Sequence, residues 1–137
     1  MNILLDTNVI LDTLLEREPH NNHSDAIFDL IASNNVFGYI NTSSVTDIYY
    51  VLRKKFSELD SRKKIRTLLN LLYTIDVTIT DLHAALDSPI NDFEDALVSA
   101  CVTKTGLDFI VTRDTEFLKN EKTISPNDFL DRFFRPY

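Results

Sequence analysis

The alternation of short apolar runs with helical patterns is the feature that most constrains the fold of this chain. Four apolar runs predict buried strands, at residues 2–6, 36–41, 75–79 and 107–112. Between these runs, apolar residues recur at helical spacing, as in the series Val45, Ile48, Tyr49 and Leu52. Strands that alternate with helices usually form a parallel sheet with helices on both faces. The expected fold is therefore α/β, a three-layer α/β/α sandwich with a mostly parallel central sheet.

Local signals predict where several helices begin and end. We expect Ser24 to begin the second helix and Thr80 to cap a short later one. Asp92 should begin the clearest helix, which ends at Gly106 because glycine readily adopts the left-handed conformation that closes a helix. Ser125, followed by proline, should cap the last helix.

Length and composition limit the class of protein. A chain of 137 residues with 44% hydrophobic and 26% charged residues fits one globular domain, expected over residues 1–137. Its single cysteine, Cys101, excludes an internal disulfide and suits a reducing compartment. Acidic residues interrupt the first apolar run, and no run approaches the roughly 20 residues of a membrane span. We therefore expect a cytoplasmic protein with no membrane partner.

The basic residues are gathered in one stretch. The net charge of −7 opposes a polyanionic partner unless basic side chains share one face. Seven of the fourteen Lys and Arg residues lie between positions 53 and 66, where two acids oppose them, which gives a local charge of +5. They are Arg53, Lys54, Lys55, Arg62, Lys63, Lys64 and Arg66. This stretch is the natural phosphate contact of the chain, and a solvated helix–loop–helix face is the alternative interpretation.

Four acidic residues should meet at the carboxyl edge of the sheet. Asp6 ends the first predicted strand, and Asp47 lies one turn into the helix after the second. Asp95 lies one turn into the helix that precedes the fourth strand, and Asp114 follows that strand. Ligands of parallel sheets bind at this edge. Two like charges about 4 Å apart repel by about 4 kcal/mol at an effective dielectric near 20, so the group needs a cation. Oxygen ligands favour Mg²⁺ or Mn²⁺ over Zn²⁺.

Each of these acids also has a purely structural explanation. Asp6, Asp92 and Asp114 stand where helix caps are expected, and Asp47 has capping-box spacing from Ser44. Seven further aspartates are expected to be exposed, namely Asp12, Asp25, Asp29, Asp81, Asp87, Asp128 and Asp131. The three histidines, His20, His23 and His83, show no pattern of a metal site.

Four motifs make the sequence resemble the PIN-domain family, and they occur in family order. The segment LLDTNVILD at residues 4–12 resembles the opening motif, and Ser43 with the segment DIYYVLRK at 47–54 resembles the second. DFEDAL at 92–97 resembles the third motif and VTRD at 111–114 the fourth. The short length is similar to that of VapC-like toxins from bacterial toxin–antitoxin systems.

The resemblance implies a Mg²⁺- or Mn²⁺-dependent endoribonuclease that hydrolyses phosphodiester bonds of single-stranded RNA. The implied catalytic residues are Asp6, Asp47, Asp95 and Asp114. The implied metal ligands are Asp6, Asp95 and Asp114, with Asp92 as a candidate further acid. Asn8, Ser43 and Thr112 become polar support residues. The second motif usually carries Glu, and Asp47 is one methylene shorter, so a water bridge can replace direct metal contact there.

The resemblance also implies partners. Single-stranded RNA would contact the basic stretch, with Arg53, Lys54, Arg62, Lys63 and Arg66 as candidate RNA-binding residues. An antitoxin protein and a second copy of the chain are candidate protein partners. The apolar segment 133–137 could serve such an interface or close the core.

Other classes fit the sequence less well. Haloacid-dehalogenase-type phosphatases need a second Asp two residues after the first, where this chain has Asn8. Phospho-receiver domains need a Lys after a later strand, and none directly follows the run at 107–112. No Ser–His–Asp triad or Cys–His pair suggests a covalent nucleophile. The remaining alternative is a catalytically inactive PIN-like module that binds RNA or protein.

Overall fold

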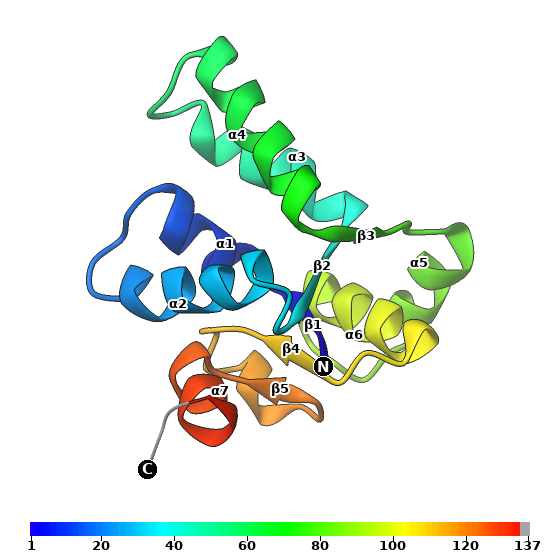
Figure 1. Cartoon of the computed structure of the whole chain (residues 1–137). Coiled ribbons are helices and arrows are strands. Elements are labelled where there is room, and N and C mark those ends of the chain that lie inside the picture. Colours follow the sequence, from blue (N-terminus) through cyan, green and yellow to red (C-terminus); the bar gives the residue numbers. More distant parts are fainter. Residues whose placement is uncertain (135–137) are drawn as a thin grey trace.

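A five-stranded parallel sheet forms the centre of the computed structural model, which describes residues 1–134 (Figure 1). The strands are β1 (Asn2–Leu5), β2 (Phe37–Asn41), β3 (Tyr73–Ile75), β4 (Phe109–Val111) and β5 (Thr123–Ile124). Their spatial order is β3-β2-β1-β4-β5, and every neighbouring pair is parallel. Ile3 in β1 lies opposite Gly38 of β2 and Phe109 of β4.

Helices cover both faces of this sheet. Those in residues 1–134 are α1 (Thr7–Leu14), α2 (Asn21–Ala32), α3 (Thr42–Leu52), α4 (Glu58–Leu71), α5 (Ile79–Leu86), α6 (Phe93–Thr105), the 3₁₀ turn η1 (Phe117–Lys119) and α7 (Pro126–Phe133). Core contacts place α1, α2, α3, α4 and α7 on one face, and α6 with η1 on the other, where α5 packs beside α6. The predicted three-layer α/β/α sandwich is therefore confirmed. Figure 1 shows α3 and α4 side by side, projecting from the body as a helical hairpin.

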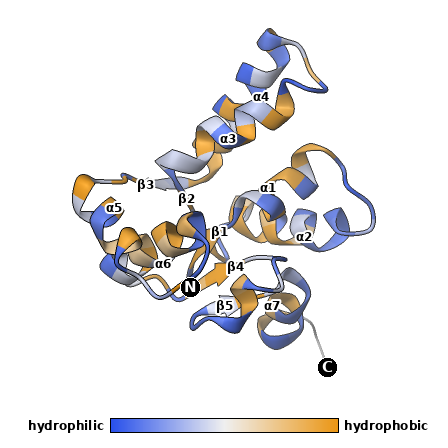
Figure 2. Ribbon diagram, turned by 180° about the vertical axis from the view of Figure 1, so that it is seen from behind, coloured by the Kyte–Doolittle hydropathy of each residue, from blue (hydrophilic) through white to orange (hydrophobic). Residues whose placement is uncertain are grey.

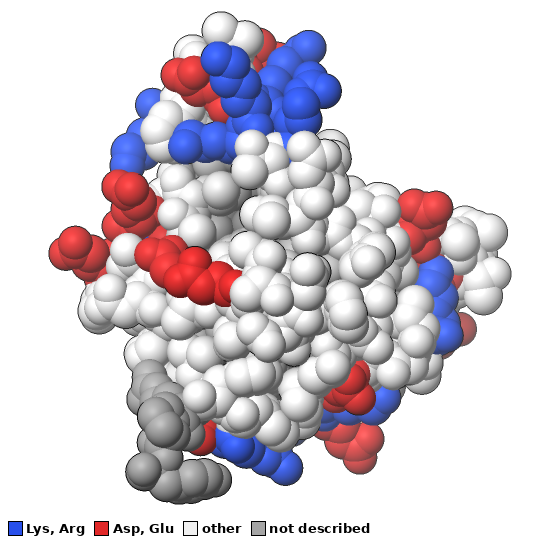
Figure 3. Space-filling view, in the orientation of Figure 1, with Lys and Arg blue, Asp and Glu red and all other residues white. Residues whose placement is uncertain are grey.

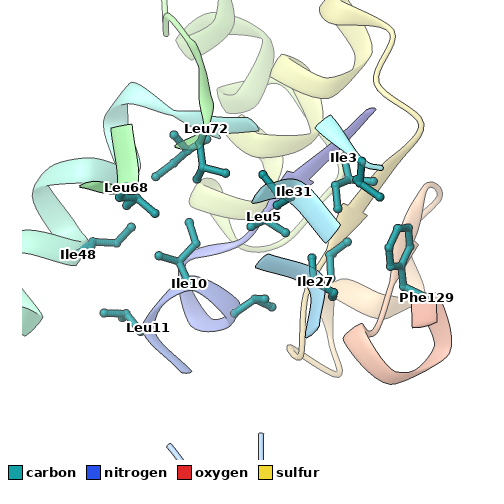
Figure 4. Packing of buried hydrophobic residues seen from close by; sticks show 14 of the residues in the cluster. Ile3, Leu5, Ile10, Leu11, Ile27, Ile31, Ile48, Leu68, Leu72 and Phe129 are labelled. Atoms are coloured by element: carbon teal, nitrogen blue, oxygen red, sulfur yellow. The ribbon is translucent and has the colours of Figure 1, made fainter. Parts of the chain in front are cut away.

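The short first strand shows why the apolar runs are continuous. Ile3 and Leu5 point into the larger core cluster with Ile10 and Ile27, as Figure 4 shows, while Leu4 points to the cluster beside α6. A strand covered on both faces needs apolar side chains at successive positions. Figure 2 shows the same distribution in the ribbon, with hydrophobic residues along the strands and many hydrophilic residues on the outer helices.

Several predicted boundaries are confirmed and others are wrong. Asp92 caps α6 and Gly106 closes it at φ 69°, and Ser125 caps α7, as expected. Ser24 does not begin α2, because it lies buried inside that helix and accepts a hydrogen bond from Thr13 over 2.6 Å. The two-residue strand β5 was not predicted, because it is too short to leave a periodic pattern.

The predicted strand at 75–79 is displaced toward the amino end of the chain. It ends at Ile75 because Thr78 begins α5 through a capping box, in which Thr78 and Asp81 satisfy each other's backbone N–H groups. Thr80, the expected cap, therefore lies within the helix. No helix in the described residues is long and apolar enough to cross a membrane.

Two aspartates that were expected at the surface are buried, which corrects the sequence analysis. Asp12 is 0% exposed and accepts two hydrogen bonds from Arg113, and Asp81 is 5% exposed and pairs with Lys104. A buried carboxylate is tolerated where a cation and hydrogen bonds compensate it. The partner of Asp12 lies about one hundred residues away in sequence, so local pattern could not reveal it. Asp25 is partly buried, and the others of that group are exposed.

Candidate active site

A cleft of about 560 Å³ opens at the carboxyl edge of the sheet, beside α1, α3 and α6. Six acidic side chains line it, namely Asp6, Asp47, Asp92, Glu94, Asp95 and Asp114. The five of these that the sequence singled out therefore do lie around one cavity. Glu94 was missed, although its place between two selected acids on the first turn of α6 was a usable signal.

Asp6 is fixed by contacts from two strands' ends. It caps α1 by accepting a hydrogen bond from the Thr7 N–H over 2.9 Å. Its other oxygen accepts from the Thr112 hydroxyl over 2.7 Å and from the Asn8 amide over 3.2 Å. Thr112 is 0% exposed and in turn accepts from the Asp114 N–H over 3.1 Å. The chain after β1 is thereby tied to the chain after β4.

Asp114 lies in the loop that this network holds. Its carboxylate accepts from the backbone N–H of Glu116 over 2.9 Å and of Phe117 over 3.4 Å. The Asn8 side-chain oxygen accepts from the Arg113 N–H over 3.1 Å, which fixes the same loop from the side of α1. Asp114 therefore holds the turn that leads into η1, although Glu116 is the cap residue of η1 itself, and Asp114 also lines the cleft.

The start of α6 brings three further acids, Asp92, Glu94 and Asp95, to the cleft. Asp92 caps this helix and accepts from the Asp95 N–H over 3.0 Å. Asp95 is partly buried, whereas Asp92 and Glu94 are exposed. Asp47, on the first half of α3, is exposed and completes the lining.

Crowding of negative charge shows in the acidities of these groups. Burial raises the pKa of Asp95 to about 7, and the charges of Asp92, Asp6 and Asp114 add to this effect. Burial also raises the pKa of Asp6, although hydrogen bonds from Thr112 and Thr7 oppose the rise. The cleft therefore holds carboxylates whose ionised forms need a compensating cation.

The donor chemistry of the cleft fits a hard divalent ion. Its acidic side chains offer only carboxylate oxygens, which suit Mg²⁺ or Mn²⁺. The residues that could hold such an ion are Asp6, Asp95, Asp114 and Asp92. Within residues 1–134, no three His, Cys, Asp or Glu side chains are gathered closely enough to hold one ion by themselves. An ion here would be coordinated by one or two of these carboxylates and by several waters, as is usual for Mg²⁺.

One basic side chain lines the cleft in the described part of the chain, and the sequence analysis did not select it. This is Arg17, which follows α1 and lies close to the buried Asp12. Ser43, expected as a support residue, also lines the cleft.

The predicted basic cluster lies on the hairpin of α3 and α4. Figure 3 shows Lys and Arg gathered over this projection. Arg53 and Arg62 both pair with Glu58, to which the Tyr49 hydroxyl also donates a hydrogen bond. Lys54, Lys63 and Arg66 are exposed. Arg53 follows Asp47 by six residues, so the cluster begins about 9 Å along α3 from the cleft.

The adjacent tyrosines of α3 differ in exposure, and the phenylalanines at the end of α7 pack against the core. Tyr49 is partly buried, and Tyr50 is 75% exposed. Phe133 and Phe134 pack against the larger core cluster. The last part of the predicted apolar segment, residues 135–137, lies outside the described residues.

Comparison with known proteins assigns the family. A family model of the PIN domain matches residues 2–116. The chain belongs to the PIN-domain family. No curated protein matches the sequence significantly.

Solved structures with this fold include several toxin–antitoxin proteins. One is a chain of VapBC2 from Rickettsia felis, in a structure with a DNA fragment of its promoter. Its TM-score is 0.67 at 17% sequence identity, and the match covers 91% of this chain and 97% of that one. A toxin–antitoxin complex from Klebsiella pneumoniae has a TM-score of 0.69 at 15% identity, over 90% and 97%. Mycobacterium tuberculosis VapC20, a toxin that cleaves the sarcin–ricin loop, has a TM-score of 0.68 at 15% identity, over 85% and 93%. The predicted similarity to VapC-like toxins is confirmed.

Proposed function

We propose that this PIN-domain protein is a metal-dependent endoribonuclease that hydrolyses phosphodiester bonds of single-stranded RNA. The observation that carries the proposal is the meeting of six carboxylates, from four separate segments of the chain, in one cleft. Such a grouping is unfavourable unless divalent cations balance it. The PIN domain, a nuclease family, supports the assignment, as does the RNA-cleaving toxin among the structures that share this fold.

The bound ion would activate a water and stabilise the charge that develops on the phosphate oxygens. The protein's own part is to hold the carboxylates in place. Thr112 and Asn8 donate to one oxygen of Asp6, and the Thr7 N–H donates to the other, so the carboxylate cannot rotate freely. The same Thr112 hydroxyl fixes the backbone of Asp114. Asp6 and Asp114 are thereby held as one pair in the cleft that Asp95 also lines.

Asp47 has a different role in this proposal. It is exposed on the rim of the cleft, and its side chain is shorter than the Glu that is usual in the second motif. Its charge helps to raise the pKa of Glu94, where burial has the largest effect, so the two carboxylates are near each other. Asp47 would hold a water of the metal shell rather than the metal itself.

The biological setting that we propose is a toxin controlled by an antitoxin in the cytoplasm. Its support is that the structures sharing this fold include VapBC2 and a toxin–antitoxin complex from Klebsiella pneumoniae. A homodimer is part of this proposal.

A catalytically inactive module that binds RNA or protein is the second candidate. It would need the basic hairpin but not the acidic cleft. The carboxylates gathered in the cleft favour the enzyme over an RNA-binding module, because gathered negative charge repels RNA unless cations balance it.

The test is cleavage of a labelled single-stranded RNA of mixed sequence in the presence of Mn²⁺. Wild type and the control Asp128→Asn, which changes an exposed acid on α7, should cleave. EDTA, Asp95→Asn and Asp114→Asn should each abolish cleavage. Equal cleavage by wild type and Asp95→Asn, with contaminating nuclease excluded, would falsify the proposal. If wild type and the variants all bind RNA and none of them cleaves it, the inactive module is favoured.

A further inference from the structure

Two arginines lie near the buried Asp12, and only one of them forms hydrogen bonds with it. Arg113 makes a bidentate contact, with nitrogen–oxygen distances of 2.5 and 2.9 Å. The nearest guanidinium nitrogen of Arg17 lies 3.8 Å from one oxygen of the same carboxylate. Asp12 is 0% exposed, so its charge needs a close cation, and Arg113 satisfies this need.

Arg17 is therefore a positioned but largely unused cation. The guanidinium can donate five hydrogen bonds, and its contact with Asp12 is too long to be one. Its side chain remains 39% exposed and lines the cleft. A purely structural ion pair at such a distance and exposure would contribute little to stability.

The backbone of Arg17 is held in place from the same helix. Its N–H donates to the Asp12 carbonyl over 2.9 Å. The preceding residue, Glu16, adopts a left-handed conformation at φ 52°, which turns the chain back toward α1. Asp12 thus fixes the backbone of Arg17 through its carbonyl, while its carboxylate lies 3.8 Å from the Arg17 guanidinium.

The charge of the cleft shows what this cation can do. When metal binding ionises all six carboxylates, their charge exceeds that of even two divalent ions by two. A phosphodiester adds a further negative charge and would be repelled. Arg17 is the one basic side chain that lines the cleft in the described residues, and its planar guanidinium matches phosphate oxygens.

We propose that Arg17 binds a phosphate of the RNA inside the catalytic cleft, and that the buried Asp12 positions it there. The inference rests on the proposed ribonuclease function. It adds a contact inside the cleft to the basic hairpin, which lies farther out. Asp12 and Arg113 serve as the anchor, and Arg17 is the residue that meets the substrate.

The test compares steady-state cleavage of a 20-nucleotide single-stranded RNA, in Mn²⁺, by wild type, Arg17→Gln and Arg17→Lys. The matched control is Arg132→Gln, which removes the same charge from the exposed side of α7, outside the cleft. Hydrogen bonds to charged groups correspond to about 10- to 100-fold in binding, so Arg17→Gln should raise KM by about 10-fold or more. The slope of log KM against log salt should fall by about 0.7, the value for one phosphate contact on a single strand. Arg17→Lys should lie between the two, and Arg132→Gln should match wild type.

A second measurement separates substrate binding from damage to the metal site. Calorimetric titration with Mn²⁺ alone should give Arg17→Gln an affinity equal to or above that of wild type, because a cation near the acids is removed. If wild type cleaves while Arg17→Gln keeps the wild-type KM and salt slope, or loses Mn²⁺ binding, the inference is wrong and the ribonuclease proposal stands. If wild type does not cleave RNA at all, the ribonuclease proposal fails and the inference falls with it. Should Arg17→Gln not fold, Arg17→Lys decides, since a bidentate phosphate contact still predicts a raised KM.

Discussion

Individual residues of the site could be predicted where their role is local. Asp6 follows an apolar run directly, and Asp92 precedes the clearest helix, so position along the chain is enough to select them. Asp12 could not be placed in this way, because helical spacing alone does not distinguish an exposed acid from one paired across the fold. Arg17 was missed for the same reason, since the residues that hold it in the cleft act through tertiary contacts.

The buried pair of Asp12 and Arg113 leads to a prediction about stability. Asp12→Ala leaves the Arg113 guanidinium without its anionic partner in a partly buried place. We expect a loss of about 3 kcal/mol in the free energy of unfolding, at the low end for broken buried pairs because Arg113 remains 31% exposed. Urea unfolding of the metal-free protein measures it.

The control for this prediction is Asp87→Ala, which removes an exposed acid near the end of α5. It should change the free energy of unfolding by no more than about 0.5 kcal/mol. Equal stabilities of the Asp12→Ala and Asp87→Ala proteins would show that the pair contributes nothing and that Arg113 finds water instead.

At the scale of elements, the sequence predicted the helices better than their junctions. α6 was predicted at both ends because a capping acid and a closing glycine act locally. The β3–α5 junction was misplaced because Ile75, Val77 and Ile79 read as one strand, while the capping box at Thr78 overrides that pattern. A β-branched run thus predicts strand only where no cap competes with it.

The hairpin of α3 and α4 carries the prediction that belongs to this scale. Three of its cations, Lys54, Lys63 and Arg66, are exposed, whereas Arg53 and Arg62 are paired with Glu58. If the hairpin contacts RNA phosphates, changing the three exposed cations to Gln should raise KM at low salt. It should lower the slope of log KM against log salt by about 2, with little change in kcat.

A matched triple variant tests whether position or total charge matters. Lys119→Gln, Lys122→Gln and Arg132→Gln together remove the same number of cations, again two lysines and one arginine, from exposed places off the hairpin. Lys119 pairs there with Glu116, and Arg132 lies over the rings of Phe109 and Phe133, so the folded state of this variant is checked by its melting temperature. We expect a much smaller effect on KM from this set. Equal effects of the two triple variants would mean that the hairpin is a solvated face and that only net charge matters.

At the scale of the whole molecule, the fold balances an acidic cleft against a basic projection in a chain of net charge −7. The parallel sheet makes this possible, because the carboxyl ends of its strands bring distant acids to one edge. The gathering of like charges is stored as reduced stability until a cation binds. Stability of the whole protein should therefore depend on pH and on metal together.

The sign of the pH effect follows from Asp95, whose pKa of about 7 in the folded protein exceeds its ordinary value of 3.8. Between these two values the folded state holds more protons than the unfolded state, so stability falls as pH rises. In EDTA, wild type should therefore lose melting temperature between pH 5 and pH 8 relative to Asp95→Asn, which lacks this group. At pH 8 the Asn variant should be the more stable protein, by about 3 °C for each kcal/mol of burial cost and charge repulsion that it removes.

Mn²⁺ should reverse that order. At a free concentration 100 times its Kd, a ligand that binds only the folded state adds about 2.7 kcal/mol to stability. Wild type at pH 8 should gain this stabilisation, and Asp95→Asn should lose most of it because a carboxylate of the cleft is gone. Thermal unfolding of both proteins at both pH values, with EDTA or with Mn²⁺, measures the effect of pH and the effect of the metal in the same experiment. If the melting temperatures of the two proteins in EDTA change in parallel with pH, the pKa of Asp95 is not raised in the folded protein and its ionisation does not destabilise the cleft.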